Sequence, residues 1–229
     1  MGLSTPAYRG GMARQPAADP APSGADSSRL RRDRDNIREL LLESAIAEFA
    51  QKGYDGASTT SIANRAEAHQ PQINYHFSSK PELWKAVVDR LFTQLDAELA
   101  DIEFGDDLAA GFAELVRRIV IHAASHPELN QIMVQESTAA TERLTWITET
   151  HVRQRYDALR GLWTALRELG VAAPIDADVI YYVVVGATSL PFINHAEARM
   201  LLTGDLGSDE QIDSHVAGIL AMLLPGRQT

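Results

Sequence analysis

The run from Ser58 to Lys80 constrains the fold of this chain more than any other stretch. Ser58 or Thr59 suits the N-cap of a short helix ending near Ala66, because a hydroxyl there accepts hydrogen bonds from the free amides of the first turn. A second short helix is predicted over residues 70–77, with Pro71 in its first turn, where a missing amide hydrogen costs nothing. Two such helices joined by a tight turn form a helix-turn-helix.

The remainder of the chain predicts an all-α protein with about nine helices. Its 229 residues are 45% apolar, which is enough for a well-buried core. Apolar residues recur at helical spacing, and neither strand alternation nor an internal repeat competes with that pattern. The expected helices cover about residues 32–52, 58–66, 70–77, 80–102, 107–125, 127–138, 142–169, 176–202 and 208–224.

The second short helix has the polar surface of a DNA reader. Gln70 and Gln72 donate and accept together, the combination that pairs with adenine in the major groove, so they are the candidate base readers. Tyr75 and His76 lie one turn along and point to phosphate, and the starts of the neighbouring helices add further backbone contacts. The predicted DNA contacts are Thr59, Thr60, Gln70, Pro71, Gln72, Asn74, Tyr75, His76 and Lys80.

The net charge of −10 argues against nucleic-acid binding until its distribution is considered, because affinity for DNA comes largely from neutralising phosphates. Residues 1–80 hold 10 Lys or Arg and 9 Asp or Glu, whereas residues 81–229 hold 11 and 22, so the acidity lies outside the helix-turn-helix. Ahead of the first helix, four arginines alternate with Asp33 and Asp35. This cluster either reaches phosphates and a minor groove or is a solvated arm. The arginines are Arg29, Arg31, Arg32 and Arg34.

Residues 32–92 resemble the DNA-binding domain of the TetR family of bacterial transcriptional regulators. The resemblance rests on an apolar first helix ending in Lys52-Gly53-Tyr54, on the helix-turn-helix, and on Lys80 followed by Leu83. Two departures are Glu67-Ala68-His69, where the family usually has Gly, an apolar residue and a hydroxyl cap, and Asn74, where many members carry Tyr. The resemblance implies a homodimer that binds an operator in double-stranded DNA and responds to a small-molecule effector.

Three segments follow from these patterns. Residues 1–28, rich in Pro, Ala, Gly and Ser, are predicted to be a disordered arm, because they hold too few large apolar side chains to offset the entropy of ordering. Residues 32–92 form the N-terminal, three-helix DNA-binding domain, and residues 93–225 form a larger, helical ligand-binding and dimerisation domain. The helix over residues 80–102 connects the two.

Two helices near the C-terminus carry more apolar surface than one chain is expected to cover. Pairing them across a two-fold axis buries the excess, as in the family that the chain resembles, although both helices could instead be core of a single chain. Two heads related in this way can read a palindromic site. The predicted interface residues are Val179, Val183, Gly186, Leu190, Ile212, Val216, Ile219 and Leu223.

Aromatic and polar residues in the second domain are candidates for an effector pocket, although most aromatics at helical spacing are ordinary core. Glu136 is either a polar anchor in that pocket or an exposed residue paired with Arg143. Pro191 is expected to kink its helix and to free an upstream carbonyl. The predicted ligand-binding residues are Trp84, Phe112, His122, Met133, Glu136, Trp146, His151, Tyr156, Trp163 and Tyr181.

Other chemistries find no support in the sequence. Cysteine is absent, the seven histidines form no metal-binding pair, and neither a nucleophile motif nor a phosphate loop occurs, so we expect no metal, no cofactor and no enzyme. The longest uncharged apolar stretch, residues 179–193, is shorter than the roughly 20 residues that span a bilayer. With no secretory signal visible, we expect a soluble, cytoplasmic protein without a membrane partner.

The leading hypothesis is therefore a homodimeric repressor released from its operator by an effector. One alternative is a ligand-dependent activator, or a regulator that needs its ligand as co-repressor. Another, of a different class, is an all-α small-molecule-binding protein or enzyme with a vestigial DNA-binding head.

Overall fold

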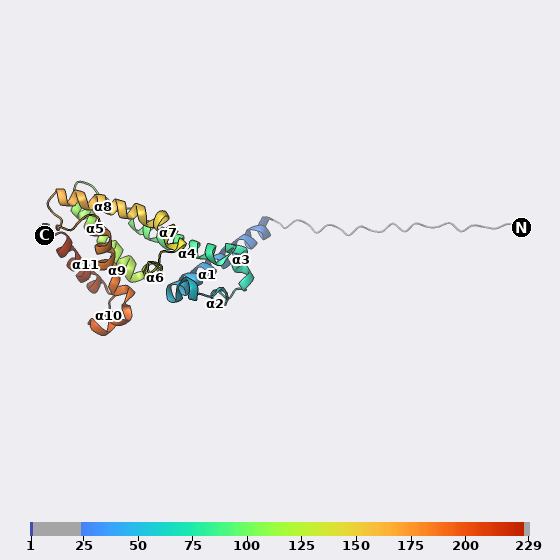
Figure 1. The fold of residues 1–229 in the computed structure, drawn as a ribbon. Helices are drawn as coiled ribbons and strands as arrows, with labels where there is room; N and C mark the ends of the chain where they lie inside the picture. The colour runs from blue at the N-terminus through green and yellow to red at the C-terminus, as the bar shows by residue number, and fades with distance from the viewer. Residues whose placement is uncertain (2–23, 227–229) are drawn as a thin grey trace. The chain divides into compact units, whose positions relative to one another are not determined.

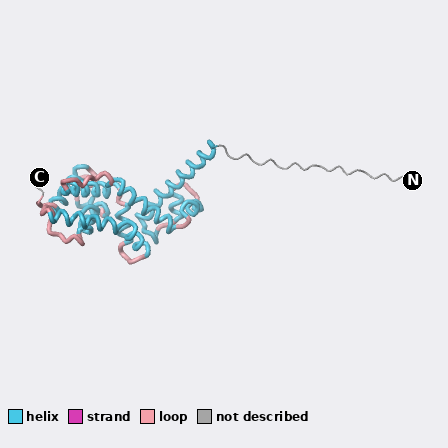
Figure 2. Tube along the Cα trace, turned by 90° about the horizontal axis from the view of Figure 1, so that it is seen from above, coloured by secondary structure: helices cyan, strands magenta, loops and turns pink. Residues whose placement is uncertain are grey.

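The computed structural model describes residue 1 and residues 24–226, with side chains described at residue 1 and from residue 34 onward. Every regular element in that part of the chain is helical, as predicted (Figures 1 and 2). Ile37–Thr229 form one compact unit, and Met1–Asn36 form the other. Most of the predicted arm, and the side chains of Arg29, Arg31 and Arg32, lie outside the described residues.

The helix-turn-helix has the predicted bounds, whereas several other helices differ. The first helix begins at Gly24 rather than near residue 32, and the predicted helices over 142–169 and 176–202 are each divided. The helices are α1 (Gly24–Gly56), α2 (Thr59–Arg65), α3 (Gln70–Phe77), α4 (Lys80–Leu99), α5 (Leu108–Ser125), α6 (Glu128–Glu136), α7 (Glu142–Ile147), the π-helical turn η1 (Thr148–Val152), α8 (Arg153–Glu168), α9 (Ile180–Ile193), α10 (His195–Leu201) and α11 (Asp209–Leu223).

The first hydrophobic core, called the head core below, lies among α1, α2, α3 and the first part of α4. Phe49, Ile62, Ile73 and Leu83 are nearly inaccessible to solvent there. Burying each such side chain contributes about 2 kcal/mol. Buried residues of α6 and α7 join the same core, so the three-helix head is packed onto helices that follow it in sequence. The predicted boundary near residue 92 therefore does not separate two cores completely.

Gly53 ends the regular part of α1, as predicted. Its φ of 70° lies in the left-handed region, which an L side chain rarely adopts. A Cβ added at Gly53 would lie 2.7 Å from Oε1 of Gln135 in α6. Nε2 of the same Gln135 donates to the carbonyl of Ala50 at 2.7 Å, so α6 satisfies a carbonyl near the end of α1.

The second core, called the body core, lies where α5 packs against α8, α9 and α11 (Figure 1). Phe112 and Trp163 are fully buried with ring centroids 5.5 Å apart, and the Trp163 indole donates to the carbonyl of Ile175 at 3.0 Å. None of the described helices combines the length and the apolar character needed to cross a membrane.

Pro191 acts on α9 as predicted, and the structure shows what meets the freed carbonyl. Proline has no amide hydrogen to donate to the carbonyl of Ala187, four residues upstream. Nε2 of His215, in α11, lies 2.8 Å from that oxygen and donates to it. Helix α9 then ends at Ile193, and Asn194 separates it from α10. The predicted single helix is thus broken just after its proline.

Candidate functional site

Helix α3 presents a polar face above a buried one. Ile73 and Phe77 are buried in the head core, whereas Gln70, Asn74 and Tyr75 are exposed. Pro71 and the α2 residue Thr60 are also exposed. His76 is half-buried, with its ring 4.9 Å from that of Tyr75 and 6.3 Å from that of Phe77. The residues predicted to read DNA thus form one accessible polar face.

The two candidate base readers differ in what their amides already contact. Oε1 of Gln72 accepts a 2.7 Å hydrogen bond from the backbone N–H of His69, the N-cap residue, so Gln72 closes a capping box on its own helix. Nε2 of Gln70 donates to Oγ1 of Thr59 at 3.4 Å, a weak contact between α3 and α2. Gln70 is therefore the freer of the two to meet a base, while Gln72 must release its cap to do so.

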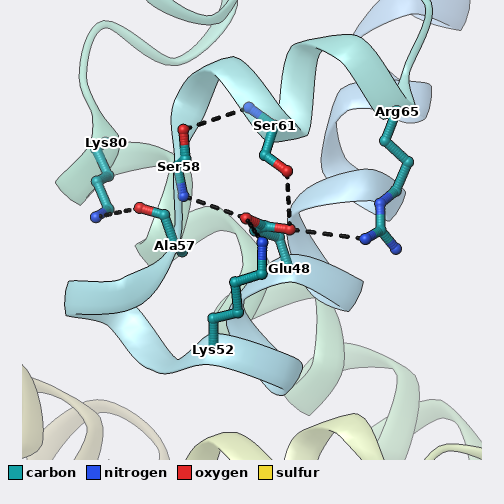
Figure 3. Close-up of polar contacts among 7 residues, drawn as sticks. All are labelled: Glu48, Lys52, Ala57, Ser58, Ser61, Arg65 and Lys80. Atoms are coloured by element: carbon teal, nitrogen blue, oxygen red, sulfur yellow. Dashed lines mark hydrogen bonds and ion pairs between the residues drawn. The ribbon is translucent and has the colours of Figure 1, made fainter.

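Lys80 is a structural tie as well as a charge. Its ammonium donates to the carbonyl of Ala57 at 2.7 Å and lies 4.7 Å from the ring centroid of Tyr54 (Figure 3). This contact joins the start of α4 to the loop before α2. The prediction treated Lys80 only as a phosphate contact, and its contact with Ala57 was not anticipated.

Glu48 of α1 is the main polar residue that the sequence interpretation missed. Its side chain is fully buried, and it accepts hydrogen bonds from the Lys52 ammonium at 2.8 Å, the Ser58 amide at 3.3 Å and the Ser61 hydroxyl at 3.3 Å (Figure 3). Arg65 lies 3.6 Å away. One carboxylate thus holds both ends of α2 against α1.

The balance of forces on Glu48 favours its charged form. Burial by itself raises the pKa of this carboxyl, but the hydrogen bond and charge of Lys52, the Ser58 amide and the Ser61 hydroxyl together hold the pKa below its ordinary value. In sequence, Glu48 and Lys52 resemble an ordinary surface pair four residues apart. The one available signal was the position of Glu48 beside the buried Phe49, between apolar neighbours.

The turn between α2 and α3 requires a left-handed residue, and Glu67 provides it with a φ of 51°. This is the position where the sequence departs from the usual glycine. A non-glycine residue in this conformation is strained, because its Cβ crowds the following carbonyl. The departure thus leaves the left-handed turn in place.

Replacing Glu67 by Gly is expected to stabilise the protein by about 0.5–1 kcal/mol, the relief of strain exceeding the added entropy of the unfolded chain. Urea unfolding of both proteins measures the difference. Gln51→Gly, at an exposed position inside α1, is the matched control and should lose about 0.5 kcal/mol. Equal losses in both variants would show that Glu67 carries no strain.

The predicted ligand-binding residues are not gathered around one cavity. Trp84, Met133 and Trp146 belong to the head core or pack against it. Phe112, Trp163 and Tyr181 belong to the body core or pack against it. The candidates therefore divide between two cores, because large aromatic rings at helical spacing fill the interior instead of lining a space. Their contact with a ligand stays a prediction.

The polar members of that set are largely engaged. Nδ1 of His122, a buried residue, lies 2.8 Å from a Glu98 oxygen. His151 pairs with Asp89 at 2.9 Å, and the Tyr156 hydroxyl donates to the carbonyl of Asp178 at 3.1 Å.

Two polar members remain to be placed. Glu136 pairs with Arg143 at 3.0 Å, as in the second alternative raised from the sequence, but it is buried instead of exposed and lines a cleft of about 210 Å³. Burial raises the pKa of the Tyr181 phenol, and the neighbouring Tyr182 adds to the shift.

A larger apolar cleft of about 490 Å³ lies between α9 and α11. Pro191 and Phe192 line one side, and His215, Gly218 and Met222 line the other. None of the predicted ligand-binding residues lines this cleft. It adjoins the helices that were predicted to pair in a dimer.

Of the residues predicted to form the dimer surface, those on α9 are accessible to solvent and those on α11 are buried. On α9 and at its N-cap, Val179 is 48% exposed, Leu190 is 55% exposed, Gly186 is exposed and Val183 is half-buried, so this face is free to meet a partner. On α11 the four predicted residues face the chain's own body core, where they are buried against α5 and α9. The interface prediction is therefore wrong for Ile212, Val216, Ile219 and Leu223.

Comparison with known proteins agrees with this architecture. Residues 41–87 match the sequence model for bacterial regulatory proteins of the tetR family. The chain is 26% identical over 187 residues to the HTH-type transcriptional repressor SCO4008 of Streptomyces coelicolor, covering 80% of this chain and 93% of that protein. It is 30% identical over 144 residues to the HTH-type transcriptional repressor NicS of Pseudomonas putida, covering 62% of each.

A solved structure with a similar fold is that of AibR in complex with isovaleryl coenzyme A and operator DNA. It superposes with a TM-score of 0.66 at 17% identity, covering 82% of this chain and 98% of that one. The similarity extends through the body helices, well beyond the residues that the sequence model matches.

Proposed function

Because this chain belongs to the TetR family of bacterial regulatory proteins, we propose that it is a homodimeric transcriptional repressor released from a palindromic operator by a small molecule. The observation that carries the proposal is the accessible polar face of α3, held on a buried apolar face within a complete helix-turn-helix. That arrangement fits the major groove of B-DNA, with Gln70 and Asn74 toward the bases. The similarity to the transcriptional repressors SCO4008 and NicS supports repression over activation.

The division of labour in DNA binding follows from the contacts at each residue. Gln70 is the principal base reader, and Gln72 contributes through the capping box that fixes the start of α3. We assign phosphate contacts to Tyr75, which is 69% exposed, and to Thr60, which is also exposed. Thr59, Pro71, His76 and Lys80 complete the set. The operator lies in the cytoplasm of a bacterium, so the protein acts there.

Dimerisation and effector binding belong to the second part of the chain, residues 93–225. The exposed α9 face supplies the dimer contact, and a two-fold axis then presents two α3 helices to successive major grooves. The structure of AibR with isovaleryl coenzyme A and operator DNA is a relative in which a small molecule and DNA are held together. For this chain we propose a small, largely apolar effector, since the body offers mainly apolar surface.

The function is tested by selecting DNA from a random pool with the full-length protein and measuring binding at several salt concentrations. Enrichment of a palindrome, with affinity that falls as salt rises, is the expected result. A thermal-shift screen against small apolar acids and acyl thioesters then searches for the effector, which must lower the affinity for the selected palindrome. Recovery of no sequence at low salt would refute the proposed function.

Replacing the two glutamines one at a time by Ala separates base recognition by Gln70 from helix capping by Gln72. Gln70→Ala is expected to reduce discrimination at one or two bases of the selected site by about 1–3 kcal/mol while leaving stability unchanged. Gln72→Ala is expected to lower the free energy of unfolding by about 1 kcal/mol through loss of the capping box. Competition binding with base-substituted sites measures the first effect, and urea unfolding measures the second.

Gln154→Ala, at an exposed position in α8, is the matched control and should change neither quantity. If Gln70→Ala retained the full sequence preference, the assignment of Gln70 as base reader would be wrong.

A further inference from the structure

Helix α4 is the element through which the body can act on the head. Its first half is buried in the head core through Leu83, Trp84 and Val87. From its middle onward α4 carries three acidic side chains, Asp89, Asp96 and Glu98, and each of these meets a basic or imidazole side chain from a later helix. The position of α4 is therefore set by polar contacts with later helices as well as by its packing in the head core.

The tightest group of these contacts joins α4 to η1 and α8. Nε2 of His151 lies 2.9 Å from a carboxylate oxygen of Asp89, and the guanidinium of Arg155 donates to both oxygens of Asp96. The same guanidinium donates to the backbone carbonyl of His151. His151 and Arg155, one turn apart, thus bind Asp89 and Asp96, which lie about two turns apart on α4.

An aromatic ring fills the space between these pairs. The Phe92 ring is buried and stacks on the His151 imidazole, with centroids 4.5 Å apart and ring planes 4° from parallel. The Arg155 guanidinium lies over Phe92, 4.7 Å from the ring centroid. The His151 and Arg155 side chains are only 12% and 25% exposed, whereas their partners Asp89 and Asp96 are 55% and 58% exposed. The basic side of each pair is therefore shielded, and the acidic side meets solvent.

His151 and Arg155, called the clamp below, lie at and just after a break in the α-helical pattern. In η1 the amide of Arg153 bonds to the carbonyl of Thr148, five residues back, instead of four. Single π-helical turns of this kind are rare and occur frequently at functional sites. Residues 142–168 run in the order α7, η1 and α8, and all three segments contact α4, through Trp146, His151 and Arg155.

Helix α5 holds the other side of α4 by separate contacts. His122 lies 2.8 Å from Glu98, and Arg118 donates to the backbone carbonyl of Glu98 at 2.8 Å. These contacts place Glu98 at the α5 side, whereas Asp89 and Asp96 face η1 and α8. The η1 contacts can therefore be broken without removing those from α5.

We propose that His151 and Arg155 are positioning residues that hold α4, and with it α3, at one place relative to the body, so that a change in η1 or α8 alters operator affinity. This proposal rests on the proposed DNA-binding function. Releasing the clamp lets α4 take several positions, and the two α3 helices then match the operator spacing for a smaller fraction of the time. The Asp96–Arg155 pair is the contact to test, because neither side chain belongs to the head core, although the Arg155 guanidinium lies over one of its members, Phe92.

The experiment compares Arg155→Gln, Asp96→Asn and the double variant with the wild-type protein on the palindrome that the wild type selects. Each single exchange is expected to weaken operator binding by about tenfold, and the double exchange should be no weaker than either single one. Arg153→Gln is the matched control, since Arg153 pairs with Glu149 at 2.9 Å on the same segment, with both side chains exposed. It should change operator affinity by less than about twofold.

Additive effects, unchanged affinity or tighter binding in the Arg155 and Asp96 variants would overturn the clamp while leaving the proposed function in place. Hydrogen exchange in the absence of DNA provides the second readout. Amides of residues 92–99 and 148–152 should exchange faster in Arg155→Gln than in Arg153→Gln. The two variants are compared at the same fraction of dimer, and the midpoint of thermal unfolding of the head should be the same in both. If wild-type protein selected no DNA, the proposed function would fail, and the exchange rates alone would decide whether the clamp holds α4.

Discussion

Replacing Glu48 by Gln is expected to lower the free energy of unfolding by about 3 kcal/mol and to abolish operator binding at temperatures where the wild-type protein binds. The exchange preserves the shape of the side chain but removes the negative charge that faces Lys52 and Arg65. An amide also carries donors, which would point at the donors of Ser58 and Lys52. Hydrogen bonds to a charged group contribute about 1.5–3 kcal/mol, and the exchange weakens several of them at once. The Lys52 and Arg65 side chains left behind are 42% and 47% exposed, so water compensates part of the loss.

The same carboxylate predicts a pH dependence of stability. The pKa of Glu48 is lower in the folded protein than its ordinary value of 4.5, so the unfolded chain binds this proton more readily. The stabilising contribution is therefore fully present above pH 4.5 and is lost as the pH falls through the lower pKa of the folded state. In Glu48→Gln that dependence is absent, and the difference between the two proteins should shrink toward acid.

Urea unfolding of both proteins between about pH 7 and about pH 3.5 measures this difference. Glu82→Gln is the control, because Glu82 and its partner Lys85 are both exposed, and it should cost no more than about 0.5 kcal/mol. A Glu48→Gln deficit that stayed constant across this pH range would show that the charge of Glu48 does not stabilise the head.

Replacing Leu190 by Asp is expected to convert the dimer to a monomer at micromolar concentration and to weaken operator binding by about a hundredfold or more. Leu190 is 55% exposed within a single chain and lies on the same α9 face as Gly186 and Val183. A carboxylate on that face would have to be buried without a partner on dimerisation. Separated heads then lose the gain in affinity that comes from binding two half-sites together.

Sedimentation measures the oligomeric state, and binding to the full palindrome and to a half-site measures the loss of affinity. Leu169→Asp is the matched control, because Leu169 is 62% exposed and lies at the end of α8, off the α9 face. The control should remain dimeric. A dimeric Leu190→Asp protein would place the interface elsewhere on the chain.

The helix-turn-helix could be predicted from the sequence to within a residue because its signals are local. Ser58 caps α2 through the amide of Ser61, and Ser79 caps α4 through the amide of Glu82. Pro71 marks the first turn of α3. Each of these effects acts within one turn of helix, so it can be recognised in the sequence without knowledge of the remainder of the chain.

Features that depend on which surfaces meet were predicted less well. The apolar stripe of α11 was correctly located, but its partner is the chain's own α5, so Ile212 and Ile219 are core and not interface. The expected ligand-binding rings were likewise correctly judged apolar, yet Trp84 and Trp163 belong to different cores. Helical periodicity predicts that an apolar face is buried, but it does not predict which helix, of the same chain or of a partner, buries it.

The sequence by itself determined that this protein is all-helical, that residues 58–80 form a helix-turn-helix with a polar reading face, and that Pro191 would free a carbonyl. Those outcomes depend on backbone hydrogen bonding and on side chains a few residues apart. Only the tertiary structure decided that Glu48 is a buried hub, that His215 meets the freed carbonyl, and that His151 and Arg155 hold α4. Those contacts join residues far apart in the chain, and a carboxylate or imidazole carries no local mark of the partner that folding will bring to it.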